Sequence, residues 1–152
     1  GALEIMLNCD FKFFSRESIF CMPPVKLGIF YNYYGLKNFI NKIGISNTRK
    51  IFFTGDKYSS KDAIDMKIFD FIYDQKDVLK KSIEFSEKIS LNAPLSLASI
   101  KKSINTFEAG QTINPEDYEQ IKKTILRAAE SFDYLEAQAA FKEKRPPNFS
   151  GK

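Results

Sequence analysis

Gly1-Ala2-Leu3-Glu4 opens the chain and leads into a stretch, Glu4 to Asn8, with the composition of a short helix. At a helix start the unpaired backbone N–H groups and the positive end of the helix dipole favour negative charge. Glu4, one turn further on, would lie near that same end. Turn glycines and first-turn acids are common, so the pattern indicates a site for a developing oxyanion only together with the segments that follow it.

Three later segments accompany this start at fixed offsets: residues 20–28 (FCMPPVKLG), the pair Tyr31-Asn32, and residues 141–147 (FKEKRPP). In this order and spacing they resemble the second half of a protein of the crotonase (enoyl-CoA hydratase/isomerase) family. The resemblance extends over essentially all 152 residues. Within the family, the segments most resemble the methylmalonyl-CoA decarboxylase branch.

The resemblance implies a fold of the α/β (α+β) class. It would be a partial crotonase-like spiral of strand-strand-helix turns, followed by a C-terminal helical trimerisation region. Residues 1–74 would form the second part of the βα core, and residues 75–152 the helical oligomerisation region. The residues themselves indicate only that strands and helices alternate at the front of the chain and that helices fill the back.

Aromatic-rich runs predict short strands at 11–14, 18–22 and 69–73, the first two on either side of a turn. The pair Pro23-Pro24 should end the second strand, because proline cannot donate to a ladder. An ordered loop is expected over residues 26–34.

Helical spacing predicts two helices at 35–43 and 47–53, ended by Gly44 and Gly55, and further helices from Gln75 onward. Cap patterns add three helix starts: a capping box from Ser59 to Asp62, the sequence Asn114-Pro115, and Ser131.

The composition excludes several kinds of chemistry. The chain has no histidine, so it can build neither a Ser-His-Asp or Cys-His nucleophile system nor a histidine metal site, and we expect no metal. Cys9 and Cys21 lack ligand spacing and are expected to be buried, reduced thiols. The formal net charge of +4 is spread along the chain, which does not indicate a nucleic-acid partner but suits a phosphate-bearing ligand such as coenzyme A.

No apolar run reaches the length of a membrane span, and the N-terminus lacks the layout of a signal peptide. We therefore expect no membrane partner and a cytoplasmic location.

By resemblance, the candidate catalytic residues are Gly1, Glu4 and Tyr31. Gly1 matches the family's second oxyanion-hole amide, although a chain that truly began there would offer an amine instead. Glu4 matches an active-site glutamate, and Tyr31 matches the active-site tyrosine of the decarboxylase branch. Two other interpretations stay open: Glu4 as a simple first-turn acid, and Tyr31 as part of an aromatic core with its neighbours Phe30, Tyr33 and Tyr34.

The candidate substrate- and CoA-binding residues are Pro24, Phe141 and Lys144. Pro24 stands where hydratases of the family carry a second glutamate, and adding water to a C=C bond needs a paired acid and base. Residues equivalent to Phe141 and Lys144 contact the adenosine end of coenzyme A in relatives, often across a subunit boundary. The alternative is that Lys144 and Arg145 form a basic, solvated helix end.

The resemblance and Pro24 together favour decarboxylation of a small malonyl-type CoA thioester through an oxyanion-hole-stabilised enolate. No cofactor is expected beyond the coenzyme A of the substrate. The expected partners are the acyl-CoA, further copies in a trimer or dimer of trimers, and an upstream N-terminal half of the same protein. The alternatives are an enoyl-CoA hydratase or isomerase, and a catalytically incompetent fragment or assembly subunit that needs that upstream half.

Overall fold

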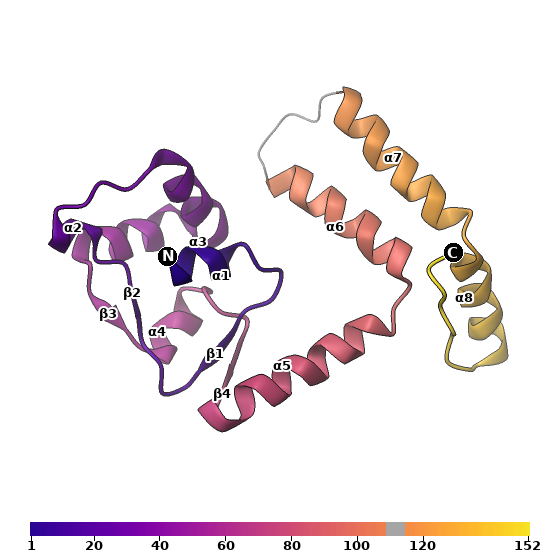
Figure 1. Cartoon of the computed structure of the whole chain (residues 1–152), viewed down its shortest axis with the longest axis horizontal. Coiled ribbons are helices and arrows are strands. Elements are labelled where there is room, and N and C mark those ends of the chain that lie inside the picture. Colours follow the sequence, from indigo (N-terminus) through magenta and orange to yellow (C-terminus); the bar gives the residue numbers. More distant parts are fainter. Residues whose placement is uncertain (109–114) are drawn as a thin grey trace. The chain divides into compact units, whose positions relative to one another are not determined.

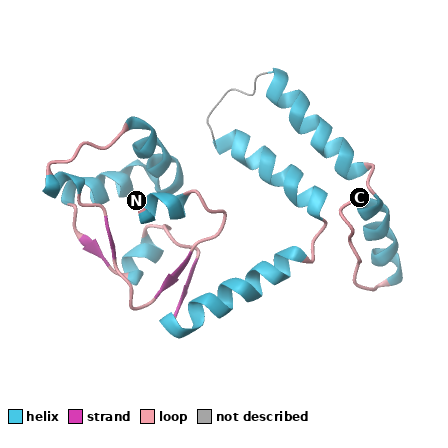
Figure 2. Ribbon diagram, viewed as in Figure 1, coloured by secondary structure: helices cyan, strands magenta, loops and turns pink. Residues whose placement is uncertain are grey.

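The computed structural model describes residues 1–108 and 115–152 and divides the chain into two units, Gly1–Ile83 and Glu84–Lys152. All strands that lie in these described residues belong to the first unit, together with helices α1 to α4 (Figures 1 and 2). In its described residues the second unit contains helices and no strand. The predicted change from a mixed front to a helical back is therefore present.

The strands form two small sheets. Strand β1 (Phe13–Ser15) pairs in parallel with β4 (Phe71–Tyr73), and β2 (Phe20–Cys21) pairs antiparallel with β3 (Lys57–Tyr58). The strands β1, β2 and β4 overlap the predicted runs. The two early strands do not pair with each other across the turn between them, since each finds its partner about 40 to 60 residues later.

Aromatic contacts hold these distant segments together. The rings of Phe14 and Phe69 stack with centroids 4.1 Å apart, and those of Phe20 and Tyr58 stack at 5.4 Å. Aromatic pairs of this kind contribute beyond the area that they bury. The many phenylalanines of the sequence thus join segments that lie far apart in the chain.

Helix α3 (Tyr33–Thr54) consists of two helices joined at a kink. Gly44, with φ 78° and ψ 159°, interrupts it, and Gly55 ends it in the left-handed conformation. Both breaks lie at the predicted glycines, which adopt positive φ without the steric cost that a Cβ would bring. The helix begins at Tyr33, two residues earlier than predicted, and is capped by Asn32, whose side chain accepts from the Gly35 N–H at 2.7 Å.

Pro23 and Pro24 do more than end a strand. Pro24 is the first residue of a short helix, α2 (Pro24–Leu27), which Gly28 ends in the left-handed conformation. Proline suits this position because its missing N–H would be unpaired there in any case. The predicted loop over 26–34 is therefore wrong at both ends and is confined to residues 28–32.

The core of the first unit lies among α1 (Ala2–Leu7), α3, α4 (Ser60–Asp65) and the strands. Its innermost side chains come from segments spread over this unit: Leu7, Phe39, Ile51 and Ile68. Ser59 caps α4 through the predicted capping box, in which its hydroxyl and its N–H each bond to Asp62.

Helix α5 (Gln75–Ser90) crosses the boundary between the units, and the second unit continues with α6 (Pro94–Glu108), α7 (Pro115–Ala129) and α8 (Phe132–Glu143). Helices α6 and α7 pack against each other. Ser131 caps α8 as predicted, whereas the predicted cap Asn114 lies outside the described residues.

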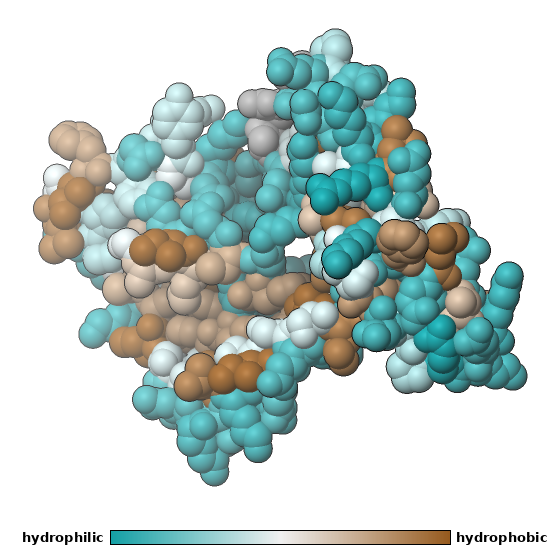
Figure 3. Space-filling view, turned by 45° about the vertical axis from the view of Figure 1, so that its right-hand side comes forward, coloured by the Kyte–Doolittle hydropathy of each residue, from teal (hydrophilic) through white to brown (hydrophobic). Residues whose placement is uncertain are grey.

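The second unit buries few side chains. Among its described residues only Ile121 and Ala140 are buried hydrophobics. Many larger apolar side chains lie at its surface, and brown apolar patches alternate there with teal polar ones (Figure 3). The exposed set includes Ile100, Ile104, Phe107, Tyr118, Ile125, Leu126, Phe132 and Phe141.

Two predictions about bulk properties can be compared with this structure. Cys9 is exposed and Cys21 half-buried, so the prediction of two buried thiols is wrong for Cys9, which follows α1 in an exposed turn. None of the helices in residues 1–108 and 115–152 is long and apolar enough to cross a membrane.

Candidate active site

Glu4 and Tyr31 are joined directly. The Tyr31 phenol donates a hydrogen bond of 2.5 Å to Oε2 of Glu4. Glu4 lies on α1, which Leu3 and Leu7 anchor in the core, and Tyr31 lies just before α3. Two candidate residues that are 27 positions apart therefore form one hydrogen-bonded pair.

The ring of Tyr31 is held from the side by two buried phenylalanines. It meets Phe52 edge-on at 4.8 Å between centroids and Phe39 edge-on at 6.2 Å. Burial, and then the hydrogen bond to the Glu4 carboxylate and its charge, raise the pKa of the Tyr31 phenol well above its usual range. The phenol is therefore a fixed, protonated donor at neutral pH.

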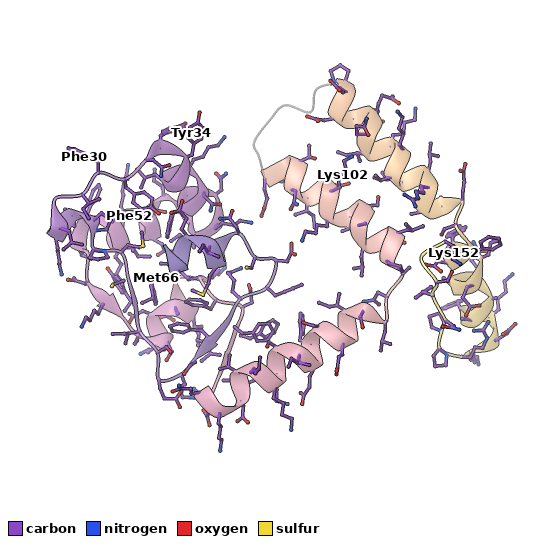
Figure 4. All side chains as sticks on the ribbon, viewed as in Figure 1. Phe30, Tyr34, Phe52, Met66, Lys102 and Lys152 are labelled. Carbon is purple, nitrogen blue, oxygen red and sulfur yellow. The ribbon has the colours of Figure 1, made fainter. Side chains whose placement is uncertain are left out.

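The neighbours of Tyr31 do not share its environment. Phe30 is 99% exposed, Tyr34 81% and Tyr33 73%, so the aromatic-core interpretation fails for these three residues. Figure 4 shows Phe30 and Tyr34 at the outside of the first unit, and Phe52 within it. Of the aromatic residues Phe30, Tyr31, Tyr33 and Tyr34, only Tyr31 packs against the core, and it also has a polar partner in Glu4.

Gly1 is exposed and precedes α1 as its N-terminal cap residue. Its carbonyl oxygen accepts from the Ile5 N–H at 3.0 Å, which closes the first turn and places Glu4 within it. Glu4 is thus both a first-turn acid and the acceptor of the Tyr31 phenol. The oxyanion role of Gly1 stays a prediction.

Pro24 is half-buried at the start of α2, and it takes no part in the bond between Glu4 and Tyr31. The Lys26 ammonium on the same helix pairs with Asp56 at 2.6 Å, just after the end of α3. Lys26 is the first cause of the lowered pKa of Asp56. Helix α2 therefore has a fixed anchor, but it offers no carboxylate at position 24.

Phe141 and Lys144 belong to the second unit. Phe141 is 86% exposed near the end of α8, and Lys144 ends that helix in the left-handed conformation, with φ 53°. The guanidinium of Arg145, next in the chain, pairs with both carboxylate oxygens of Glu136 at 2.6 and 2.9 Å.

Residues 145–151 fold back along α8 through two acids that the sequence analysis did not single out. Glu136 holds Arg145 and the Asn148 N–H, and the Arg145 guanidinium is the first cause that lowers the Glu136 pKa to about 2. Asp133, which is buried, accepts from the N–H groups of Ser150 and Gly151 at 2.6 and 2.9 Å. We call this arrangement the tail clamp; Lys152, whose carbonyl accepts from Phe132, closes it beside the start of α8 (Figure 4).

Comparison with known proteins shows similarity over the full length of the chain. The model of the enoyl-CoA hydratase/isomerase family matches residues 1–152. The methylmalonyl-CoA decarboxylase of Escherichia coli (strain K12) is 30% identical over 99% of this chain and 58% of its own length. An enoyl-CoA isomerase/hydratase of Mycosarcoma maydis is 31% identical over 100% of this chain and 55% of its own length.

Solved structures agree in fold. An enoyl-CoA hydratase/isomerase family protein from Hyphomonas neptunium has a TM-score of 0.88 at 21% identity, covering 99% of this chain and 56% of its own. An enoyl-CoA hydratase from Bacillus anthracis has a TM-score of 0.81 at 24% identity, covering 99% of this chain and 57% of its own. The chain thus spans little more than half the length of the relatives named here.

Proposed function

Because the chain belongs to the enoyl-CoA hydratase/isomerase family, we propose that it acts on acyl-CoA thioesters and that its reaction is the decarboxylation of a small malonyl-type thioester. The observation that carries this proposal is the hydrogen-bonded pair of Glu4 and Tyr31. No cofactor beyond the coenzyme A of the substrate is part of the proposal.

Decarboxylation makes a simple demand on such a site. The bond between the α-carbon and the carboxylate breaks and CO2 leaves. The electron pair of the broken bond stays behind and forms the enolate of the thioester. N–H groups at a helix start, with Gly1 as the candidate, would stabilise the enolate oxygen, and a proton taken from water then adds to the α-carbon. The Tyr31 phenol, which donates to Glu4 in the free protein, would donate to the substrate carboxylate instead and so orient it. A second carboxylate beside Glu4 raises the energy of the charged ground state, and departure of neutral CO2 relieves that repulsion.

Pro24 supports decarboxylation over hydration. Placing and cleaving a water molecule requires an acid and a base, and the proline ring at this position supplies neither. The second candidate, isomerisation of an enoyl thioester, asks only for a proton moved between two carbons. A single carboxylate such as Glu4 suits that reaction, and the relative from Mycosarcoma maydis bears both activities in its name.

The test uses the 152-residue chain with three substrates in parallel: methylmalonyl-CoA, malonyl-CoA and crotonyl-CoA. We expect CO2 from one or both of the malonyl-type thioesters and little or no hydration of crotonyl-CoA. Hydration of crotonyl-CoA without CO2 release would overturn the decarboxylase proposal. If the chain binds coenzyme A but turns over none of the substrates, the remaining alternative is a fragment or subunit that needs an upstream half.

The assembly is a second part of the proposal. Large apolar side chains lie exposed along α6, α7 and α8, and exposed apolar surface that forms a contiguous patch is typical of an interaction site. We propose that copies of the chain pack through these helices as a trimer or a dimer of trimers. Light scattering at micromolar concentration should give the mass of three or six chains, and a stable monomer would contradict it.

A further inference from the structure

Gly35 lies buried in the first turn of α3, beside the Glu4–Tyr31 pair. Its N–H donates to the Asn32 side chain that caps the helix. Its backbone is not in the left-handed region, so the conformation does not require a glycine. Alanine is the better helix former at such a position. The absence of a side chain here must therefore have another cause.

That cause is space. A Cβ at position 35 would lie 2.6 Å from Cε1 of Tyr31, 3.0 Å from Oε1 of Glu4 and 3.3 Å from Nδ2 of Asn32. Two carbon atoms in contact prefer a separation of about 3.5–4.0 Å. The clash therefore falls mainly on the Tyr31 ring, and then on the carboxylate to which Tyr31 donates.

The Tyr31 ring has little freedom to move aside. Phe39, which is fully buried, and Phe52, which is nearly so, pack edge-on against it. Displacement would draw the phenol away from Glu4, and hydrogen bonds weaken as distance and angle depart from the preferred geometry. The ring thus lies between two phenylalanines and the bare backbone of α3.

We propose that Gly35 is a positioning residue: by leaving the surface of α3 bare, it lets the Tyr31 phenol and the Glu4 carboxylate meet at hydrogen-bonding distance. The catalytic importance of this placement rests on the proposed function, whereas the placement itself rests on the geometry alone. Gly35 touches no reacting atom in this proposal and acts only through Tyr31 and Glu4.

The test follows the Tyr31 phenol by NMR of chains labelled with ¹³C at tyrosine Cζ. The chain has seven tyrosines, and Tyr31→Phe assigns the signal that disappears. In the wild type this signal should resist deprotonation while the exposed tyrosines titrate. In Gly35→Ala, where the bond to Glu4 is lost but the ring stays buried, Tyr31 should titrate at a lower pH than in the wild type. An unchanged Tyr31 signal in a folded Gly35→Ala chain would overturn the proposal.

Gly44→Ala is the matched control, because it makes the same exchange in the same helix. A Cβ there meets no atom within 4 Å but must adopt φ 78°. It should lower the melting temperature through strain and leave the Tyr31 signal unchanged. If Tyr31 titrates at a lower pH in this control as well, any damage to α3 would be enough to separate the phenol from Glu4. That result would overturn the specific role of Gly35.

A second background keeps the test decisive if Gly35→Ala does not fold. Tyr31→Leu retains an apolar side chain but has no atom at the position of Cε1. In that background Gly35→Ala should no longer lower the melting temperature. If the double variant does not fold although Tyr31→Leu alone does, the proposal is overturned.

Activity separates this inference from the proposed function. In a chain that releases CO2, Gly35→Ala should lower kcat about as much as Tyr31→Phe, with KM nearly unchanged. If instead the wild-type chain turns over no thioester but Gly35→Ala still releases the phenol, the proposed function fails and the positioning role stands.

Discussion

The two units of the chain are stabilised in different ways. The first unit has a contiguous hydrophobic core that includes Leu7, Phe39, Ile51 and Phe69, and Tyr31 packs against that core. The second unit, in its described residues, buries only two hydrophobic side chains and relies on caps, helix pairing and the tail clamp. The difference explains why the Glu4–Tyr31 pair is held in place by its own unit. In the second unit, by contrast, large apolar side chains stay exposed and can contact another protein surface.

The largest effect expected from this difference is on stability. Phe39→Ala removes a fully buried ring that supports both Phe52 and Tyr31, and should lower the free energy of unfolding by about 3–5 kcal/mol. Ile104→Ala in α6 removes an exposed side chain and should cost less than about 0.5 kcal/mol in a monomer. Denaturant unfolding measures both.

The same two variants test whether the units differ in this way. A cost for Ile104→Ala that rises with protein concentration would mean that self-association buries this face, in agreement with the proposed oligomer. Equal, concentration-independent costs for the two variants would contradict the assignment of the core to the first unit.

The next effect concerns chemistry. Tyr31→Phe keeps the ring between Phe39 and Phe52 but removes the hydroxyl that bonds to Glu4. If the phenol orients the substrate, turnover should fall about a hundredfold, equivalent to about 2.7 kcal/mol. Stability should fall by only about 0.5–1.5 kcal/mol. Steady-state kinetics and unfolding of the same preparation measure the two quantities, and a loss of stability with full turnover would reduce Tyr31 to a packing residue.

Local sequence patterns predicted most of the elements of this fold. The breaks at Gly44 and Gly55, the capping box from Ser59 to Asp62 and the cap at Ser131 are confirmed because each depends on neighbouring residues only. Strand pairing was missed, because β1 and β4 meet through contacts such as Phe14 with Phe69 that no local pattern contains. The first turn of α2 was missed because a double proline was interpreted only as the end of a strand.

The candidate site divides in the same way. The resemblance selected Glu4 and, partly by its spacing from Glu4, Tyr31, but only the fold shows that the two bond to each other. Gly35 could have been noticed, since a glycine three residues after the Asn32 cap is unfavourable for a helix unless space demands it. Asp133 and Glu136 gave no such signal, because acids in the first turns of a helix are ordinary.

A third effect tests the tail clamp. Asp133→Asn replaces one acceptor oxygen with an NH2 group where three donors, the Ser150 N–H and hydroxyl and the Gly151 N–H, converge. Because Ser150 is exposed and Gly151 half-buried, water can partly replace the lost acceptor, and the cost should be about 1 kcal/mol. Amide exchange should accelerate at 150–151, and the Phe39 amide in the other unit serves as the internal control. Unchanged protection at 150–151 would remove Asp133 from the clamp.

A smaller effect is expected in acid. The pKa of Glu136 is lowered from an ordinary value near 4.5 to about 2, so its folded-state pKa lies below that of the unfolded chain. The contribution of Glu136 is then fully present above about pH 4.5 and is lost as the pH falls toward 2. The protection of the Asn148 amide, measured relative to its intrinsic exchange rate at each pH, should fall over that window in the wild type. In Glu136→Gln the protection of the Asn148 amide should be low at every pH in this range. Protection that does not change with pH in the wild type would contradict the ion pair.

The smallest effect concerns coenzyme A and the end of α8. If the Lys144 ammonium contacts the adenosine end, Lys144→Ala should weaken binding by about 0.5–1.5 kcal/mol, as for an exposed charged contact. Lys144→Gly removes the same ammonium but suits φ 53°, which is costly for alanine. Stability should therefore be higher for the glycine variant, while calorimetry should give both variants the same loss of affinity. A loss in the alanine variant alone would trace the effect to strain at the helix end, and wild-type affinity in both would remove Lys144 from the binding site.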